Sequence, residues 1–381
     1  MKIGIITFYA SNNMGAMCQA YALQRAVQSL YPEARCGVVD YLAENRRVPP
    51  TLAGVFQRKC GRTLTGKLKG AIHCALLMRA RWTSSGLSAC QDFVDGDMCT
   101  FRDARISQDG KLDCSAASEP YDVLIAGSDQ VWGCGFSMRP YLFCEAVQDF
   151  PVRKVAYAPS LGGLERFDDA SRALLGRRAS SFASLSCREA DGAELLARLT
   201  GKPCPVVLDP TLLLEPEEWR RLARKPKNAP KGDFVFSYQV TWSKDCTRVA
   251  RAAAKRLGLP LVFIRSITPY SFYSACGPRE FLWYIANAKQ VVTSSFHGTA
   301  LSLSLGTPFL SVRTEHAQSR ITNLLRAAGL EHCYVAGTDD LPPNLGCRHN
   351  GYAHLHDAIA ASRQYLQRAL GDTVPHRETV L

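Results

Sequence analysis

The sequence predicts an α/β protein built from two doubly wound units, each with a mainly parallel sheet covered by helices on both faces. Short β-rich runs alternate with helical stretches along the chain, which is the pattern of repeated βαβ units. The 381 residues exceed what one hydrophobic core ordinarily holds and fit two domains of roughly 150 to 200 residues each. A charged, proline-rich stretch at 215–233 interrupts the alternation, so we expect the linker there.

The first predicted unit covers residues 1–214. Each of its expected strands is a short apolar run that ends in a polar or glycine-containing turn. These strands lie at 2–8, 37–42, 121–127, 154–160, 184–189 and 205–210. Helical stretches follow at 16–31, near 168–182 and at 190–199. We also expect a basic helical insertion near 46–95.

The second predicted unit covers residues 234–381. Its expected strands lie at 234–240, 260–264, 289–294 and 308–312, and its expected helices at 244–259, 277–288, 298–306, 319–330 and 352–370. We expect the final helix to pack back on the first unit. Two such units that face each other form a cleft between the carboxyl ends of their sheets, where ligands of doubly wound folds bind.

The composition is that of a globular protein, because 46% of the residues are hydrophobic and 21% are charged. No run of about 18 apolar residues is present that would predict a membrane span. The start, MKIGIITFYAS, lacks the pattern of a secretory signal peptide and reads as a first strand. We therefore expect a cytoplasmic protein.

The fifteen cysteines do not form a metal-binding or disulfide pattern. The closest pair, Cys90 and Cys99, leaves no C-x-x-C motif, so we interpret most of them as small buried apolar residues in a reducing compartment. His349, His354 and His356 lie near one another in the sequence, but no carboxylate or cysteine pattern completes a tetrahedral set. We expect a polar surface there and no metal.

The net charge of +12 is concentrated in one segment. Residues 46–81 contain nine lysines and arginines, interleaved with leucine and isoleucine, and no acidic residue. This pattern predicts a basic amphipathic helix that binds an anionic membrane surface or a phosphorylated substrate, or a solvated helix that covers a core. Nucleic acid is not expected, because only Phe56 and Trp82 could stack on bases and no base-reading motif is present.

Polar residues follow the strands of the first unit. The first loop places Asn12, Asn13 and Gly15 at a helix start, where they could bind an anion or merely cap the helix. It lacks the G-x-G-x-x-G fingerprint, so a dinucleotide is not expected. Two further loops contribute the candidates Gly127, Ser128, Asp129, Gln130 and Ser160. Asp129 could accept bonds from sugar hydroxyls, hold a cation, or cap a helix.

Two other loops contain the strongest candidates. Arg188 ends a predicted strand, where it could bind a carboxylate or phosphate through two parallel bonds, or form a salt bridge with Glu189 or an aspartate. Asp209, which precedes Pro210, is expected to shape a turn. His297 lies at a strand-to-helix turn beside Gly298. A helix N-terminus disfavours a charged imidazolium, so His297 would be usable as a base near neutral pH. A purely structural role is the alternative.

Six segments resemble the polysaccharide pyruvyl transferase family, and their order along the chain matches as well. They read NNMGAMCQAYALQ, YDVLIAGSDQVWG, YAPSLG, SCREADGAELL, VLDPTLLL and SSFHGTALSLSLGTPF. The resemblance implies a glycosyltransferase-B-like fold of two Rossmann-type domains. It also implies transfer of pyruvate from phosphoenolpyruvate, as a ketal, onto a sugar of a cell-surface polysaccharide or its lipid-linked precursor, with no cofactor or metal required.

The resemblance also implies roles for individual residues. His297 corresponds to an essential catalytic histidine, and Arg188 to an arginine that holds the acidic groups of the donor. The other implied donor-binding residues are Ser295, Phe296, Gly298 and Arg320, and the polar residues of the first-unit loops would line the acceptor side. Some relatives have an arginine where this chain has Ser295, and Arg265, Arg313 or Arg320 could replace it.

Acceptors of such enzymes are often lipid-linked, so we expect residues 46–81 to contact the acceptor or the inner face of the membrane. Two alternatives remain at this point. One is a nucleotide-sugar glycosyltransferase of the same fold, although no acidic ribose-binding element is recognisable in the second unit. The other is a non-catalytic carbohydrate-binding relative, for which Ser295 is the main indication.

Overall fold

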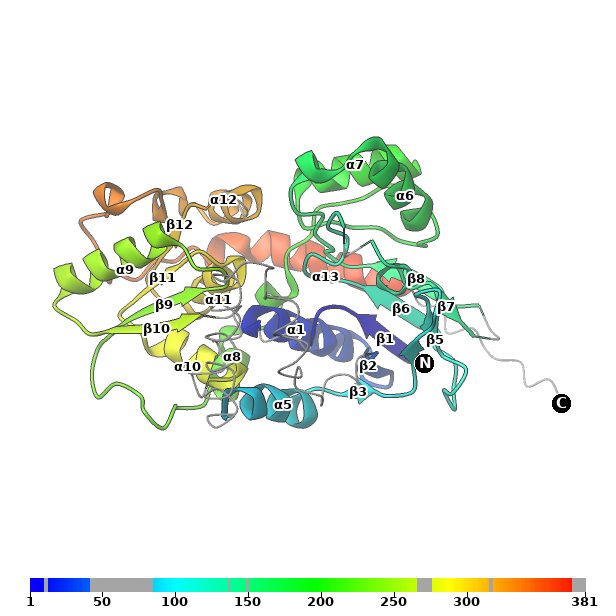
Figure 1. Cartoon of the computed structure of the whole chain (residues 1–381), viewed down its shortest axis with the longest axis horizontal. Coiled ribbons are helices and arrows are strands. Elements are labelled where there is room, and N and C mark those ends of the chain that lie inside the picture. Colours follow the sequence, from blue (N-terminus) through cyan, green and yellow to red (C-terminus); the bar gives the residue numbers. More distant parts are fainter. Residues whose placement is uncertain are drawn as a thin grey trace, which may run out of the picture.

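The computed structural model describes residues 1–9, 13–41, 85–135, 138–148, 151–265, 276–314 and 318–371. Within these ranges two parallel sheets lie side by side, with helices packed against both faces (Figure 1). This confirms the predicted fold class of two Rossmann-like α/β units. Asn12 and the basic segment at 46–81 lie outside the described residues, so the predictions for them stay predictions.

The first sheet has five parallel strands in the order β3-β2-β1-β6-β8. Their bounds are Thr100–Phe101, Arg35–Val39, Lys2–Ile6, Val123–Ala126 and Arg153–Ala156. β1 and β6 are buried along their whole length. A strand with helices on both faces has no solvated side, which is why both read as continuous apolar runs and not as an alternating pattern.

The second sheet also has five parallel strands, in the order β10-β9-β11-β12-β13. Their bounds are Leu261–Arg265, Val235–Gln239, Gln290–Thr293, Phe309–Val312 and Tyr334–Val335. A small third sheet joins β4 (Arg105–Ile106), β5 (Leu112–Asp113) and β7 (Ala146–Val147). This third sheet was not predictable from the sequence, because strands of two residues are too short to show a periodic pattern.

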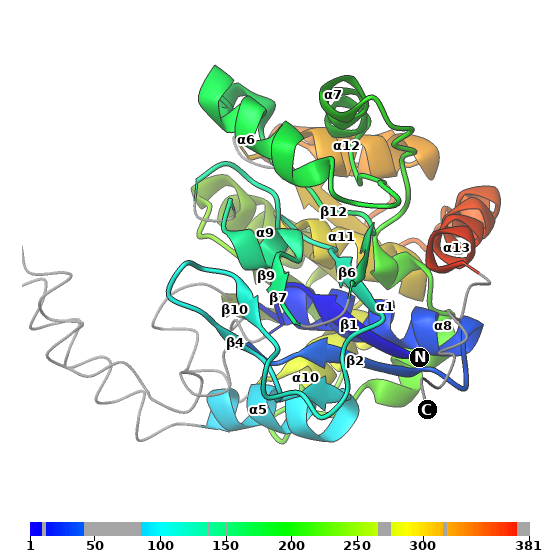
Figure 2. The ribbon, with the colours of Figure 1, turned by 90° about the vertical axis from the view of Figure 1, so that its right-hand side faces the viewer.

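Helices cover both sheets, and helices from each sequence half lie side by side (Figures 1 and 2). The α-helices are α1 (Met14–Leu30), α5 (Ser85–Asp97), α6 (Asp169–Ala179), α7 (Ala190–Thr200), α8 (Pro216–Leu222), α9 (Lys244–Leu257), α10 (Pro278–Asn287), α11 (Phe296–Leu305), α12 (Gln318–Ala327) and α13 (His356–Leu370). The 3-10 helices are η1 (Pro140–Phe143), η2 (Leu164–Arg166), η3 (Pro210–Leu212), η5 (Glu331–Cys333), η6 (Thr338–Asp340) and η7 (Ala353–Leu355).

Two predicted strands of the first unit do not form as strands. The segments at 184–189 and 205–210 make only the isolated bridges Val155–Ser184 and Cys187–Val206. The hydroxyl of Ser186 takes the place of backbone groups in the hydrogen bonding between these segments and the sheet. It accepts from the Ala158 amide at 3.1 Å and donates to the Ala156 carbonyl at 2.8 Å. The polar side chains of these two segments therefore lie on irregular backbone beside the sheet.

The predicted linker at 215–233 contains the helix α8, and Trp219 on this helix is fully buried. Its indole donates to the carbonyl of Thr211 at 3.1 Å. α13 returns to the first sheet, where the Tyr365 hydroxyl donates to the Ala156 carbonyl at 2.8 Å and Arg153 donates to the Ala369 carbonyl at 3.0 Å. The exact domain boundaries stay a prediction.

The buried core is continuous from the first sheet through α1 and η3 to α10 and α11. Nine of the thirteen cysteines in the described ranges are buried, and burial raises the pKa of thiols such as Cys144 and Cys246 to about 12. These cysteines therefore behave as small apolar residues, as predicted. No helix within the described ranges is long and apolar enough to cross a membrane.

Candidate active site

The strand orders identify one edge of each sheet as the place for a ligand. In the first sheet, β1 and β6 are neighbours, and the strands that follow each of them in the sequence are added on opposite sides. The same reversal lies between β9 and β11 in the second sheet. Ligands of doubly wound sheets bind in the crevice outside the carboxyl ends of strands at such switch points. The loops concerned include Gly127–Gln130 after β6 and Ser294–His297 after β11.

The turn that holds His297 is tightly bonded. Ser295 is the N-cap of α11, and its hydroxyl accepts from the Gly298 amide at 3.3 Å. The Thr293 hydroxyl accepts from the Ser295 amide at 3.0 Å and donates to the Tyr238 carbonyl at 2.7 Å. A Cβ on Gly298 would lie 2.4 Å from the Thr293 oxygen, so only glycine fits there. Ser295 thus has a structural role in the position where some relatives have an arginine.

His297 is the second residue of α11 and is 4% exposed. Its ring reaches across to the first unit, where Nε2 lies 3.5 Å from Oδ2 of Asp209. On another side the ring contacts the start of α1, because a Cβ built on Gly15 would lie 2.4 Å from the histidine Cβ and 2.5 Å from Nδ1. The two units therefore meet at this imidazole.

Arg188 lies beside His297 and is 3% exposed at its side chain. Nη1 donates to Asp209 Oδ2 at 2.7 Å. Nε and Nη2 form the other edge of the planar guanidinium, and neither has a hydrogen-bond partner within the described residues. The nearest carboxylate oxygens, on Glu189 at 3.6 Å and on Asp129 at 3.9 Å, are too far for hydrogen bonds. This edge has the geometry that binds two oxygens of a carboxylate or phosphate.

Phe296 supports this arginine from one face. The guanidinium carbon of Arg188 lies 4.5 Å from the centre of the Phe296 ring, which is a cation–π contact. The aromatic ring belongs to the second unit and the arginine to the first. The structure shows the salt bridge of Arg188 to an aspartate, whereas anion binding by its Nε–Nη2 edge stays a prediction.

Glu189 forms a second centre of charge in the site. It is 1% exposed, accepts a hydrogen bond from the hydroxyl of Ser160, and lies 4.0 Å from Nε of Arg320 on α12. Burial and the charge of nearby Arg188 lower the pKa of Arg320. Of the three arginines that could replace the one expected at Ser295, Arg320 is in the site, whereas Arg313 stacks on Tyr334. The side chain of Arg265 lies outside the described residues.

The site therefore contains the guanidinium groups of Arg188 and Arg320 and the imidazole of His297, opposite the carboxylates of Asp129, Glu189 and Asp209. Burial on its own would raise the pKa of Asp209, but the charges of His297 and Arg188 outweigh it and hold this pKa well below its usual range. For Arg188, burial lowers the pKa, and the neighbouring carboxylates more than reverse this. The carboxylate of Asp209 and the guanidinium of Arg188 are thus both charged at neutral pH.

The loop after β6 contributes two of the predicted polar residues directly. Ser128 is fully buried and donates to Asp209 Oδ2 at 3.1 Å. Asp129 adopts a φ of 66°, which is uncommon outside glycine, and its carbonyl accepts from the Ser160 amide at 2.8 Å. Gly127 packs against the Tyr157 carbonyl, with a φ of 120° and no room for a Cβ. The backbone N–H of Gln130 donates to the carboxylate of Asp129.

Asn13 acts as a helix cap in the structure. Its Oδ1 accepts from the amides of Gly15 and Ala16 at 3.1 and 3.3 Å and from the hydroxyl of Tyr238 in the second unit at 3.4 Å. Simple capping was the stated alternative to anion binding, and the contacts of Asn13 agree with it. Gly15 has a different importance, since its missing side chain makes room for His297.

Asp209 and Glu189 are two carboxylates of the site that were not among the residues predicted from the sequence. Asp209 was expected to shape a turn, and it does cap η3 through the Thr211 amide at 3.0 Å. However, its second oxygen joins Arg188 and His297. The available signal was the position of both carboxylates, each within a segment that carries the family resemblance, SCREADGAELL for Glu189 and VLDPTLLL for Asp209. Trp242 follows β9 at the carboxyl edge of the second sheet and is 53% exposed.

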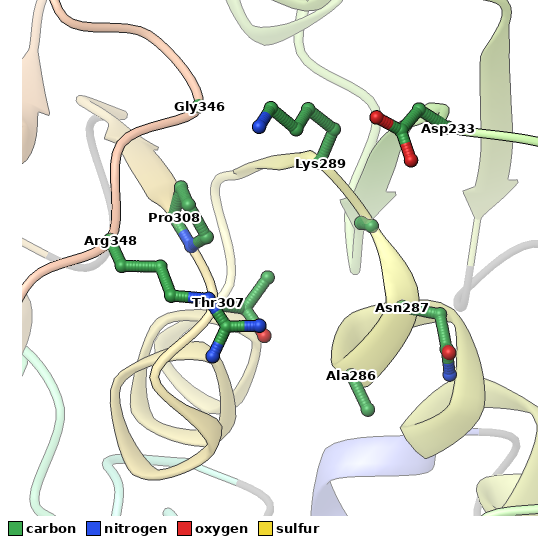
Figure 3. A pocket seen from close by; sticks show the side chains of 9 residues that line it. Asp233, Ala286, Asn287, Lys289, Thr307, Pro308, Gly346 and Arg348 are labelled. Atoms are coloured by element: carbon green, nitrogen blue, oxygen red, sulfur yellow. The ribbon is translucent and has the colours of Figure 1, made fainter.

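A separate pocket lies at the opposite edge of the second sheet. It is lined by Asp233, Lys289 and Pro308, which precede β9, β11 and β12, and by Arg348 (Figure 3). None of the predicted site residues lines it. Within the described ranges, no three His, Cys, Asp or Glu side chains are grouped so that they could hold a metal ion, and this includes the region of His349 and His354.

Asp209 makes stability depend on pH in a defined direction. Because the pKa of this carboxyl is lower in the folded protein than its ordinary 3.8, its contribution to the unfolding free energy is full above that value and is lost as the pH falls toward the folded pKa. We expect the difference in melting temperature between wild type and Asp209→Asn to stay constant from about pH 8 to 5 and to shrink below about pH 4. Differential scanning fluorimetry checks this; a difference that holds down to about pH 3 contradicts it.

Several solved structures are similar to this chain over most of its length. Among solved structures, the chain is similar to the UDP-GlcNAc 2-epimerase from Methanocaldococcus jannaschii at 10% identity, with 96% of this chain and 99% of that chain covered and a TM-score of 0.48. The UDP-GlcNAc 2-epimerase from Neisseria meningitidis bound to UDP-GlcNAc is 10% identical, with 96% and 99% covered and a TM-score of 0.43. The E. coli heptosyltransferase WaaC with ADP-2-deoxy-2-fluoro heptose is 12% identical, with 83% and 89% covered and a TM-score of 0.36.

A search of curated protein sequences gave no significant match. In contrast, residues 13–316 match the family described as polysaccharide pyruvyl transferase. The matched range contains Gly15, Ser128, Arg188, Asp209 and His297, the residues that meet at the junction of the two units. Because the match covers most of the chain, the protein belongs to the polysaccharide pyruvyl transferase family.

Proposed function

We propose that the protein transfers pyruvate from phosphoenolpyruvate to two hydroxyls of a sugar, forms a cyclic ketal and releases phosphate. The observation that carries this proposal is the buried edge of Arg188, whose Nε and Nη2 have no hydrogen-bond partner within the described residues, next to His297 at the junction of both switch points. Membership of the family supports the proposal, and the donor and the ketal chemistry are our inference.

The donor has a carboxylate and a phosphate, and the site offers cations for both. In the proposed complex, Arg188 binds one anionic group through the Nε and Nη2 edge. Arg320, whose Nε lies 4.0 Å from Glu189, approaches the same site from α12 and binds the other. A buried arginine interacts strongly with an oxyanion because the water that would screen the charge is excluded.

His297 supplies the proton in the proposed reaction. A proton moves from the imidazole to C3 of the enol, and C2 becomes electrophilic. One sugar hydroxyl forms a C–O bond to C2 and returns its proton to the imidazole. The C2–O bond to phosphate then breaks, and the second hydroxyl adds to C2 and gives its proton to the departing phosphate. The products are the ketal and inorganic phosphate, and no oxidant or reductant is consumed.

The acceptor would approach from the same edge of the second sheet. Trp242 follows β9 and exposes 53% of its surface, and an exposed indole offers a flat face with an N–H donor for a sugar ring. Asp129 is 7% exposed and has carboxylate oxygens that could accept bonds from sugar hydroxyls. These two side chains are the acceptor contacts that we propose.

The proposal is tested with phosphoenolpyruvate and a panel of glycosides that carry hydroxyl pairs able to close a cyclic ketal. We expect phosphate release that depends on both substrates, with a product whose mass equals glycoside plus pyruvate minus water. A parallel thermal-shift assay compares phosphoenolpyruvate with a panel of nucleotide sugars. Stabilisation by a nucleotide sugar alone would favour the glycosyltransferase alternative. Saccharide binding without phosphate release would favour the non-catalytic alternative.

A further inference from the structure

The carboxylate of Asp209 is the most connected group in the site. Its side chain is completely buried, and Asp209 caps η3 at the point where the chain leaves the first sheet. One oxygen, Oδ1, is fixed locally, because it accepts from the Thr211 amide at 3.0 Å and from the Thr211 hydroxyl at 2.7 Å. These two bonds set the direction of the carboxylate plane.

The other oxygen, Oδ2, faces groups from three different parts of the chain. It accepts from the Ser128 hydroxyl at 3.1 Å and from Arg188 Nη1 at 2.7 Å, and it lies 3.5 Å from Nε2 of His297. Ser128 and Arg188 belong to the first unit, whereas His297 belongs to the second. A single oxygen atom therefore fixes the distance between the two groups to which the proposed function assigns proton transfer and donor binding.

We propose that Asp209 is a positioning residue, which keeps the ring proton of His297 on Nε2 and turns the Nε–Nη2 edge of Arg188 toward the donor. The inference rests on the proposed function for its catalytic consequence. The geometry itself belongs to this chain and does not depend on which donor is used.

The electrostatics of the pair give the reason for the proton position. A lone pair on Nε2 would point at an ionised oxygen 3.5 Å away and would be repelled, whereas an N–H at that atom is attracted. Nε2 makes no hydrogen bond within the described residues. The charge of Asp209 therefore orients the Nε2 proton without a hydrogen bond to it.

The same bond pattern orients Arg188. Asp209 holds Nη1 at 2.7 Å, and one face of the guanidinium lies against the Phe296 ring. The guanidinium plane therefore cannot rotate freely. The edge formed by Nε and Nη2 therefore has a fixed direction before a donor arrives. Pre-organised donors lower the cost of ordering at the moment of binding.

A purely structural counter-ion is the competing explanation, and a matched variant separates the two. Asp103 lies at the amino end of the same sheet and accepts from Lys2 Nζ and from the Tyr121 hydroxyl, each at 2.5 Å. It is thus also a carboxylate joined to a buried cation and a hydroxyl, but far along the strands from the site. Asp103→Asn serves as the control for Asp209→Asn.

The kinetic arm measures kcat and KM for phosphoenolpyruvate together with melting temperature in the full-length protein. We expect Asp209→Asn to lower kcat about 100-fold, Asp209→Glu to recover about tenfold of this loss, and Asp103→Asn to keep kcat within about threefold of wild type at a comparable loss of melting temperature. If Asp209→Asn and Asp103→Asn lose kcat equally for equal loss of stability, the positioning role is wrong.

The second arm does not depend on turnover. Long-range proton–nitrogen spectra of protein labelled with ¹⁵N-histidine show which ring nitrogen carries a proton, and comparison with His297→Gln assigns the signal. We expect a proton on Nε2 in wild type and its shift toward Nδ1 in Asp209→Asn. An unchanged pattern would refute the proposal. If wild type releases no phosphate while the pattern changes as expected, the proposed function fails and the positioning role stands.

Discussion

Replacement of His297 by glutamine is expected to lower kcat for pyruvyl transfer by about 10²–10⁴-fold, because glutamine cannot exchange a proton with C3 of the donor or with the sugar hydroxyl. The KM for phosphoenolpyruvate should change by less than about fivefold, since the arginine edge that binds the donor is not removed. Steady-state phosphate release at several donor concentrations separates the two parameters.

The chain offers a matched control for this variant. His349 is a partly buried histidine whose Nε2 lies 3.2 Å from the Thr307 carbonyl and whose ring packs on Phe309. Both contacts are at the amino end of β12, on the edge of the second sheet that faces away from the site. His349→Gln should reduce stability and leave kcat close to wild type. A His297→Gln enzyme that retained more than about a third of kcat would remove His297 from the proton-transfer step.

The second large effect is expected from Gly15→Ala, a change of one methyl group outside the charge cluster. The added Cβ would lie 2.4 Å from the Cβ of His297 and 2.5 Å from its Cγ, so the imidazole has to move. A displacement of about 1 Å at a reacting group can cost about 10²-fold in rate. We expect kcat to fall on that order, while overpacking lowers the free energy of unfolding by about 1–3 kcal/mol.

Gly96→Ala is the control for this steric effect. Gly96 is an exposed residue of α5, and among the described residues the only atom within 4 Å of its added Cβ is Nη2 of Arg279 at 3.2 Å. Alanine in a helix is favoured over glycine by about 1 kcal/mol, so this variant should be as stable as wild type or more so, and fully active. If Gly15→Ala kept wild-type kcat, the contact between α1 and the imidazole would not constrain the reaction.

Most of the fold was predictable because it depends on local patterns. Continuous apolar runs at 2–8 and 121–127 predicted buried parallel strands, and β1 and β6 formed there. The segments at 184–189 and 205–210 show similar runs but form only single bridges. Hydroxyl side chains such as Ser186 compete with the backbone for the ladder hydrogen bonds, and a hydrophobic pattern does not show that competition.

The candidate site was predictable in part for a related reason. His297 and Arg188 could be selected because each lies in a post-strand loop and matches a motif, and loops at one sheet edge converge in every doubly wound fold. The strand order was not predictable in detail, and neither were the contacts of His297 with Asp209 and Gly15 that join the loops of the two sheets. Contacts between residues far apart in the chain depend on that order.

The sequence by itself determined the α/β class and the loops that carry polar residues, since these follow from local backbone and side-chain preferences. Only the tertiary structure decided that Asp209 joins Arg188 to His297, that Ser295 is used as a cap, and that Gly15 makes room for an imidazole 282 positions later. The physical reason is that a buried charge or a close contact is defined by its partners in space, and those partners come from both units.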